Sequence, residues 1–214
     1  MASDRDSHLA PLVGVLALQG DFADHQSALS ACGLRTRQVR TPAQLRGCDA
    51  LVLPGGESTT MIRLLDVEGL WEPLRAALQS GVPVMATCAG LILLSQRVEN
   101  PEQRSFGLLP LTVVRNGYGR QYHSGTFALT AESAELPGSL EGTFIRAPRI
   151  TAVHGACEVL ARRDGDPVLV RKGPLLAACF HPELAVAHPV TKMFAEMVRA
   201  AVAQPAATDA AVGV

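Results

Sequence analysis

The chain has 214 residues, of which 48% are hydrophobic and 18% are charged, and its formal net charge is −1. At roughly 100–200 residues per domain, this length predicts one folded domain, and the low charge content excludes a solvated, disordered chain. Balanced acidic and basic side chains argue against nucleic-acid binding, and no apolar run reaches the roughly 18 residues that span a bilayer.

The first half of the chain alternates short apolar runs with amphipathic segments. The runs predict buried strands, the second of them weaker than the rest, at 13–18, 36–39, 50–53 and 82–87. The segments between them predict helices, the first of them capped by Asp21, over 21–32, 58–65, 70–79 and 89–95. Strands that alternate with helices in this way predict a parallel sheet with helices on both faces.

The second half contains shorter strand candidates, separated by Gly, Pro and charged turns, at 111–114, 127–130, 152–153, 158–161, 168–170 and 175–179. A final helix is expected over 189–203. Together these features predict a three-layer, flavodoxin-like α/β fold whose mostly parallel twisted sheet carries added antiparallel strands. We expect one domain over 13–203, with a mobile N-terminal extension at 1–12 and a mobile tail at 204–214.

The five cysteines are scattered and form no C-x-x-C pair, which argues against a disulfide framework or a zinc site; they are Cys32, Cys48, Cys88, Cys157 and Cys179. Reduced thiols predict a cytoplasmic protein, and residues 1–11 lack the apolar core of a secretory signal. Five histidines show no metal-ligand spacing and are expected to be surface or core groups; they are His8, His25, His123, His154 and His188. We expect neither a metal nor an organic cofactor.

Cys88 stands apart because it lies where a predicted buried strand meets a predicted helix, with small residues on both sides. A sharp strand-to-helix turn needs small neighbours, since the nucleophile adopts a strained backbone. The turn lifts the side chain above the carboxyl end of the sheet, and the helix N-terminus beyond it favours an anion. The alternative is a buried structural cysteine at a tight turn.

A base is expected at the end of the last apolar strand, where His181, Pro182 and Glu183 follow one another. Side chains alternate along an extended segment, so His181 and Glu183 project to the same side. The carboxylate can then orient the imidazole toward a thiol, as the third member of a triad does. Taken alone, this short pattern is also typical of a surface loop.

Two glycines, Gly55 and Gly56, follow the strand at 50–53 and let backbone N–H groups approach a substrate closely. The N–H groups of Gly56 and Ala89 are candidates for an oxyanion hole. A phosphate-cradling loop is the rival interpretation, but the G-x-x-x-x-G-K-[ST] pattern is absent. A plain turn with Ser58 as the helix cap is the structural alternative.

Together these three pieces resemble the class I (triad) glutamine amidotransferases. The finer sequence is similar to the branch that supplies the glutaminase subunit of pyridoxal 5'-phosphate synthase, in the vitamin B6 route. The segments that carry the resemblance spread over most of the chain, at 14–20, 53–61, 87–92, 115–121, 144–148 and 180–184. One departure is Ala86, where related amidotransferases often have glycine two residues before the cysteine.

The resemblance implies hydrolysis of L-glutamine to L-glutamate and ammonia. It makes Cys88 the nucleophile, His181 the general base and acid, and Glu183 the orienting carboxylate. It also places the contacts to glutamine on Gly56, Glu57, Ser58, Arg115, Ile145 and Arg146. Guanidinium groups suit a substrate carboxylate because they are planar and permanently charged.

The resemblance further implies a partner, a synthase subunit that is a (β/α)8 barrel in a large ring and makes pyridoxal 5'-phosphate. Ammonia would pass to it through a closed channel. Gln19, Gly20 and Asp21 lie at the same sheet edge as Cys88, and we expect that edge to be the docking face. A reorientation of the peptide between Gly55 and Gly56 on docking would complete the oxyanion hole.

Three other interpretations remain open. The chain is an amidotransferase subunit of another pathway, a DJ-1-like cysteine-elbow protein of redox sensing or stress response, or a non-catalytic interaction subunit. The subfamily segments argue against the first, and the His-Pro-Glu segment argues against the second. An intact triad has no use in a scaffold, which argues against the third.

Overall fold

The computed structural model describes residues 10–118 and 124–203. The expected mobile ends therefore lie outside the described residues, apart from 10–12, and so do 119–121 of the resemblance segment at 115–121. Leu12 already belongs to the first strand and pairs with Arg35, so that strand begins one residue earlier than predicted.

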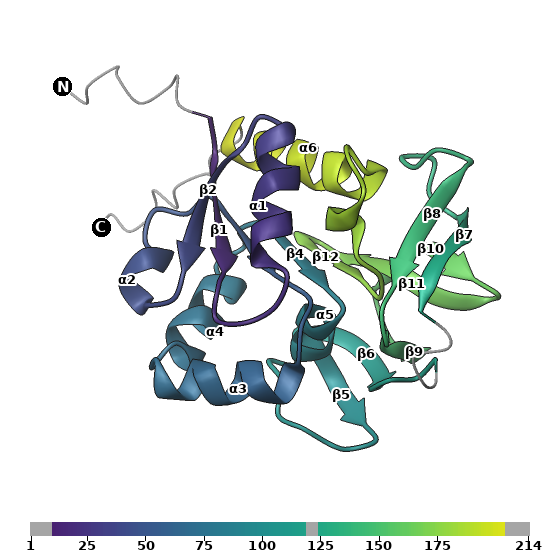
Figure 1. Cartoon of the computed structure of the whole chain (residues 1–214), viewed down its shortest axis with the longest axis horizontal. Coiled ribbons are helices and arrows are strands. Elements are labelled where there is room, and N and C mark those ends of the chain that lie inside the picture. The colour runs from purple at the N-terminus through teal and green to yellow at the C-terminus, as the bar shows by residue number, and fades with distance from the viewer. Residues whose placement is uncertain (1–9, 119–123, 204–214) are drawn as a thin grey trace, which may run out of the picture.

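One large sheet organises the molecule (Figure 1). Its order is β2 (Arg35–Val39), β1 (Leu12–Leu16), β3 (Ala50–Leu53), β4 (Val84–Thr87), β12 (Leu175–Ala178), β11 (Asp166–Lys172), β10 (Glu158–Arg163), β7 (Gly125–Ala131) and β8 (Leu140–Phe144). The strands from β2 to β12 run parallel, and those from β12 to β8 pair antiparallel. A parallel sheet with added antiparallel strands was the predicted fold, and it is confirmed.

A second, three-stranded sheet lies beside the large one, in the order β5 (Ser95–Glu99), β6 (Leu109–Val114) and β9 (Arg149–Val153). The sequence analysis missed β5 and expected its first residue to end a helix. It also missed β8 and the short helix α2 (Pro42–Leu45). In β5 only Ser95 and Val98 are buried, so the strand has no apolar run by which to find it.

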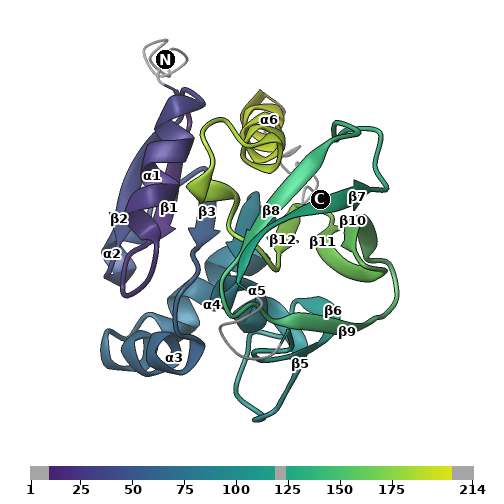
Figure 2. The same cartoon turned by 45° about the vertical axis from the view of Figure 1, so that its right-hand side comes forward.

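The helices cover the parallel part of the sheet in two groups (Figure 2). Helix α1 (Phe22–Ala31) packs against α6 (Pro189–Ala203), whereas α3 (Ser58–Val67) packs against both α4 (Trp71–Gln79) and α5 (Ala89–Leu94). The central strands β3, β4 and β12 are buried along their whole length, as their continuous apolar sequences require. Their carboxyl ends meet at one edge of the sheet.

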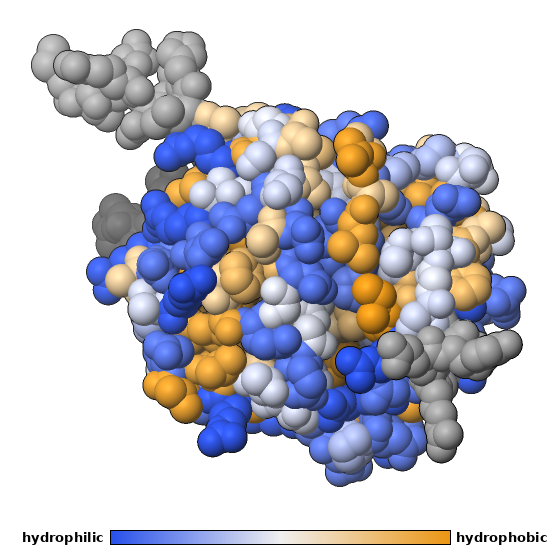
Figure 3. Space-filling view, in the orientation of Figure 1, coloured by the Kyte–Doolittle hydropathy of each residue, from blue (hydrophilic) through white to orange (hydrophobic). Residues whose placement is uncertain are grey.

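The surface in the same orientation is largely hydrophilic, but a line of hydrophobic side chains descends from the region of α6 across the middle of this face (Figure 3). Large hydrophobic side chains that stay exposed include Ile145, Leu184 and Val186, the last of them 96% exposed. Among the described residues, no helix is long and apolar enough to cross a membrane.

Candidate active site

Cys88 follows β4 directly and is the residue before α5. Its backbone has φ 46° and ψ −102°, a conformation that costs a non-glycine residue energy and clusters at functional sites. The Cys88 N–H donates to the Ala178 carbonyl at 2.9 Å, which ties the turn to the neighbouring strand β12. A Cβ at Gly90 would lie 2.1 Å from the Leu53 carbonyl oxygen, so the turn does require a glycine there. The predicted strained elbow is confirmed.

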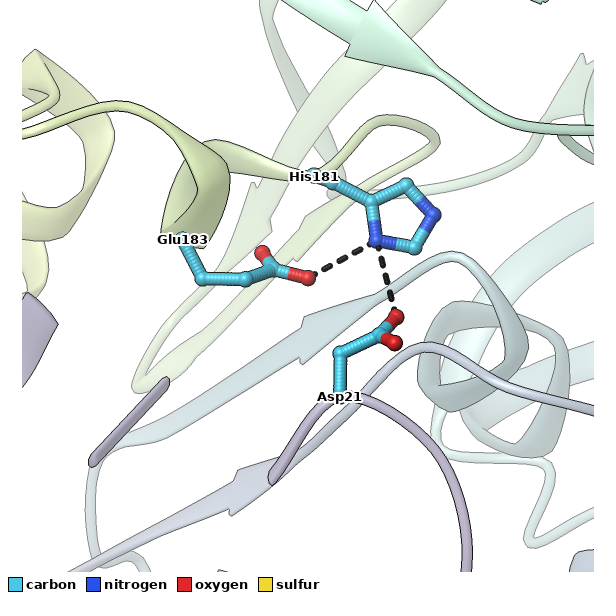
Figure 4. A group of neighbouring side chains, drawn as sticks. All are labelled: Asp21, His181 and Glu183. Carbon is cyan, nitrogen blue, oxygen red and sulfur yellow. Dashed lines mark hydrogen bonds and ion pairs between the residues drawn. The ribbon is translucent and has the colours of Figure 1, made fainter. Parts of the chain in front are cut away.

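His181 and Glu183 follow β12, and Glu183 belongs to the one-turn helix η2 (Pro182–Leu184). Both side chains are buried, and His181 Nδ1 lies 2.8 Å from Glu183 Oε1 (Figure 4). The main chain of His181 is held as well, because its N–H donates to the Thr143 carbonyl at 2.8 Å. The carboxylate therefore orients the imidazole, as predicted, but the expected extended segment is wrong, because the chain turns into a helix directly after His181.

Asp21 contributes a second carboxylate to the same imidazole, with Oδ2 3.3 Å from His181 Nδ1 (Figure 4). The sequence analysis expected Asp21 to cap α1. It does occupy the N-cap position, but its side chain makes no capping hydrogen bond. The prediction of a side-chain cap was wrong because the imidazole, which is distant in sequence, takes the carboxylate instead.

The electrostatics of this group favour a charged pair. Burial opposes a charge on His181, but hydrogen bonds to Asp21, Cys88 and Glu183 outweigh it and raise the pKa of His181 far above its usual value. Burial likewise opposes a charge on Glu183, but hydrogen bonds from His181 and His25 lower its pKa. Since Nδ1 faces the two carboxylates, Nε2 is the nitrogen left for Cys88, and it makes no other hydrogen bond to the part of the chain that is described.

These shifts predict how the pair stabilises the fold as pH changes. The raised pKa of His181 contributes stability below the unfolded value of 6.5, and this is lost as pH rises through the raised pKa. The lowered pKa of Glu183 contributes stability above 4.5, and this is lost as pH falls. Both contributions are complete between pH 4.5 and pH 6.5. A double-mutant cycle of His181→Gln and Glu183→Gln should therefore give its largest coupling energy, about 0.5–3 kcal/mol, in this pH window. Urea unfolding inside and on either side of the window measures it, and a pH-independent coupling energy would contradict the assignment.

A pocket of about 420 Å³ opens beside Cys88 and His181. The residues predicted to contact substrate all line it, and they are Gly56, Glu57, Ser58, Arg115, Ile145 and Arg146. Gln19 and Asp21, expected at a docking edge, line it too. Ala89 does not; it is buried as the first residue of α5, directly after Cys88.

The loop after β3 is clamped by the segment that follows β1. The Asp21 N–H donates to the Gly55 carbonyl at 3.3 Å, and the side-chain oxygen of Gln19 accepts from the Glu57 N–H at 2.7 Å. A Cβ at Gly20 would lie 1.8 Å from the Gly55 carbonyl oxygen, so only glycine allows this approach. These contacts hold the two segments together at the pocket.

Glu57 is the cap of α3, in place of the Ser58 cap weighed for a plain turn. Its carboxylate accepts hydrogen bonds from the N–H groups of Thr59 and Thr60. These bonds outweigh the effect of burial and lower the pKa of Glu57 to about 2. The same carboxylate holds Arg115 at 2.7 Å, so Glu57 positions a guanidinium at the pocket wall.

The segments that carry the pocket arginines rest on buried aromatic side chains. Phe144, the residue before Ile145 and Arg146, packs edge-on against Tyr118 at 5.7 Å and tilted against Phe180 at 5.6 Å. The guanidinium of the buried Arg163 lies 3.5 Å from the centre of the Phe127 ring. This packing fixes the ends of β6 and β8 against each other and so places both arginines at one pocket.

His25 is a residue whose place at this site the sequence analysis did not anticipate. It is fully buried on α1, 3.4 Å from Glu183 Oε1. The one available signal was its spacing of four residues from Asp21, which puts both side chains on one face of a helix. Of the other histidines, His188 is buried against the Glu141 carbonyl and His154 contacts Thr112 at the surface, while His8 and His123 lie outside the described residues.

The atoms of Asp21, His181 and Glu183 that could bind a metal lie within 4.8 Å of one another. They are already hydrogen-bonded, since His181 Nδ1 faces both carboxylates. Their arrangement is therefore that of an oriented imidazole, and we assign no ion to it.

The chain matches the model of the SNO glutamine amidotransferase family over residues 15–200. It is 47% identical to the pyridoxal 5'-phosphate synthase subunit PdxT of Streptomyces coelicolor, covering 89% of this chain and 95% of the relative. The PdxT of Koribacter versatilis is 49% identical, with 87% and 95% covered. A crystal structure of a glutamine amidotransferase with 42% identity superposes with a TM-score of 0.80 and covers 87% of this chain and 98% of that one. The resemblance predicted from the sequence is confirmed.

Proposed function

Because the chain belongs to the SNO glutamine amidotransferase family, we propose that it is the glutaminase subunit of a pyridoxal 5'-phosphate synthase. It hydrolyses L-glutamine to L-glutamate and delivers the ammonia to a separate synthase subunit. The observation that carries the proposal is the convergence of Cys88, His181 and Glu183 from two strand ends at one pocket lined by both arginines.

The reaction begins when His181 takes the thiol proton of Cys88 and the sulfur attacks the side-chain amide carbon of glutamine. His181 Nε2 faces the pocket and gives its proton to the departing ammonia, which leaves a thioester on Cys88. His181 then takes a proton from water, the hydroxide attacks the thioester carbon, and glutamate leaves as His181 returns the proton to the Cys88 sulfur. Glu183 holds the imidazole in orientation through both steps.

The negative oxygen that forms during attack needs donors at the turn. The N–H groups of Gly56 and Ala89 are our candidates, since Gly56 lines the pocket and Ala89 begins α5 directly after the nucleophile. One such donor contributes roughly 3–4 kcal/mol in comparable sites. The Gly55 carbonyl is held by the Asp21 N–H, so any reorientation of this peptide must break that bond.

Recognition of glutamine is assigned to the two arginines that line the pocket. Arg115 is already fixed by Glu57, which leaves it oriented to meet the substrate carboxylate. Arg146 has φ 44°, and its N–H donates to the Ser124 hydroxyl, so its main chain is held in an unusual conformation at the same pocket. The Ser58 hydroxyl donates to the side-chain oxygen of Gln103, and Ser58 lines the same pocket.

The partner is proposed to be a (β/α)8-barrel synthase subunit in a large ring, docking over the edge formed by Gln19, Gly20 and Asp21. Exposed Leu184 lies one residue after Glu183, and exposed Ile145 lines the pocket itself. We place the interface over these two side chains and the pocket mouth. A cover over the pocket also keeps ammonia from reaching water, where it would mostly be protonated. The free cysteines suit the cytoplasm, where we place the protein.

The test measures glutamate release and pyridoxal 5'-phosphate formation with the purified chain, a synthase subunit, ribose 5-phosphate, glyceraldehyde 3-phosphate and glutamine. We expect glutamine to support formation of the product only when both proteins are present, while ammonium replaces the glutaminase. Synthase subunits of other amidotransferase pathways are the control and should not be supplied with ammonia. No glutamate release with the matched synthase would overturn the proposal. Equal glutamate release with and without the synthase would refute only the idea that docking completes the oxyanion hole.

A further inference from the structure

His25 lies beneath the predicted triad and is completely buried, on the first turn of α1. The main-chain N–H of His25 donates to the Asp21 carbonyl at 3.2 Å, so the first turn of the helix carries Asp21 and His25 on one face. Its Nε2 lies 3.0 Å from Thr87 Oγ1 and 3.4 Å from Glu183 Oε1. Thr87 is the last residue of β4, directly before Cys88. One imidazole therefore touches both strand ends that carry the chemistry.

An apolar side chain would fill this buried position without leaving a polar atom unpaired. The imidazole does leave one, because His25 Nδ1 has no hydrogen-bond partner among the described residues. A buried unsatisfied polar atom costs roughly 1–3 kcal/mol. The contacts of Nε2 must offset that cost, which separates His25 from an ordinary core residue.

The chemistry of the partners decides which nitrogen carries the hydrogen. An ionised carboxylate only accepts hydrogen bonds, so the nitrogen that faces Glu183 must be Nε2–H. His181 and His25 both address the same oxygen, Oε1, while Oε2 of Glu183 has no partner in the described part of the chain. Without His25, the buried carboxylate would depend on His181 alone and on Coulomb attraction for its position.

We propose that His25 is a positioning residue for the reaction, because it fixes the Glu183 carboxylate against the end of β4 and so sets the spacing between imidazole and nucleophile. The proposal rests on the proposed glutaminase function. His25 does not line the pocket and touches no substrate, so it acts through Glu183 and Thr87. Like Asp21, it would be a side chain outside the triad on which the triad depends.

Two substitutions separate a positioning role from filling the core. In His25→Gln the side-chain amide nitrogen reaches about as far as Nε2 and can still donate to Glu183. In His25→Leu the volume is kept and the donor is lost. We expect His25→Leu to lower kcat about 10–100-fold with KM little changed, as supporting partners of catalytic ligands do, and His25→Gln to recover most of the rate. The acid limb of the kcat/KM profile should also move to higher pH in His25→Leu, since Glu183 loses a donor that lowers its pKa.

The matched control is His188→Leu, which removes another buried histidine, near the start of α6, whose ring contacts the Glu141 carbonyl and the Val190 N–H. It should lower the unfolding temperature without changing the pH profile. A folded His25→Leu with the rate and profile of the original protein overturns the inference, as does a His25→Gln that is no better than His25→Leu.

A stability measurement keeps the inference testable apart from the proposed activity. The double-mutant cycle of His25→Gln or His25→Leu with Glu183→Gln should show coupling for the leucine variant and little for the glutamine variant. Additive effects for both would overturn the contact, whatever the enzyme assay gives. An original protein without glutaminase activity, but with this pattern of coupling, would refute the proposed function and leave the His25 contact standing.

Discussion

Replacing Cys88 by alanine is expected to remove glutamate release, with a loss of about 10⁴-fold or more in kcat. The sulfur supplies the bond to the amide carbon, and no other described thiol lines the pocket. Alanine is small and keeps the tight turn, so the fold should survive. Thermal unfolding and a glutamate assay in the presence of the synthase measure the two effects separately.

Cys157→Ala is the matched control, because that cysteine is half-buried, free and remote from the pocket. It should keep its full activity. Retained activity in Cys88→Ala would show that the nucleophile lies elsewhere, and the triad assignment would fail with it. Ammonium should still support the synthase in the presence of the Cys88→Ala protein, since the docking face is unchanged.

Replacing Glu183 by glutamine is expected to lower kcat on the order of 10⁴-fold while the protein stays folded. The amide keeps the size of the carboxylate but loses its charge, so the imidazolium formed during attack is no longer stabilised. The amide can also present N–H to His181 Nδ1 and favour the wrong tautomer. Because Asp21 also contacts Nδ1, a residual activity above that of Cys88→Ala is expected. Steady-state kinetics of glutamate release measure both rates.

The control for this substitution is Glu196→Gln, which removes an exposed carboxylate on α6 without touching the pocket. It should have the kinetics of the original protein. A Glu183→Gln variant with normal kcat would mean that Asp21 alone suffices to orient His181. The double variant Asp21→Asn, Glu183→Gln would then have to fall to the level of Cys88→Ala.

Local sequence was enough for the elements whose identity depends on neighbouring residues. The apolar strand before Cys88 and the small residues after it predict a strained turn, and the structure has one. The spacing of His181 and Glu183 predicted an oriented imidazole, and the contact is present, although a one-turn helix makes it and not the extended chain that the prediction assumed. Uninterrupted apolar runs likewise identified the central strands, since these are buried on both faces.

Tertiary structure decided the contacts between segments that no local pattern links. Asp21 was expected to cap its own helix, and it lies against an imidazole that is distant in the sequence. His25 became a partner of Glu183 only because β1 and β4 lie in one sheet and bring α1 under the end of β12. Strand β5 has too few buried residues to show in its sequence, and pairing with β6 creates it. Periodicity reports which face of an element is buried, whereas the order of strands in the sheet determines what that face meets.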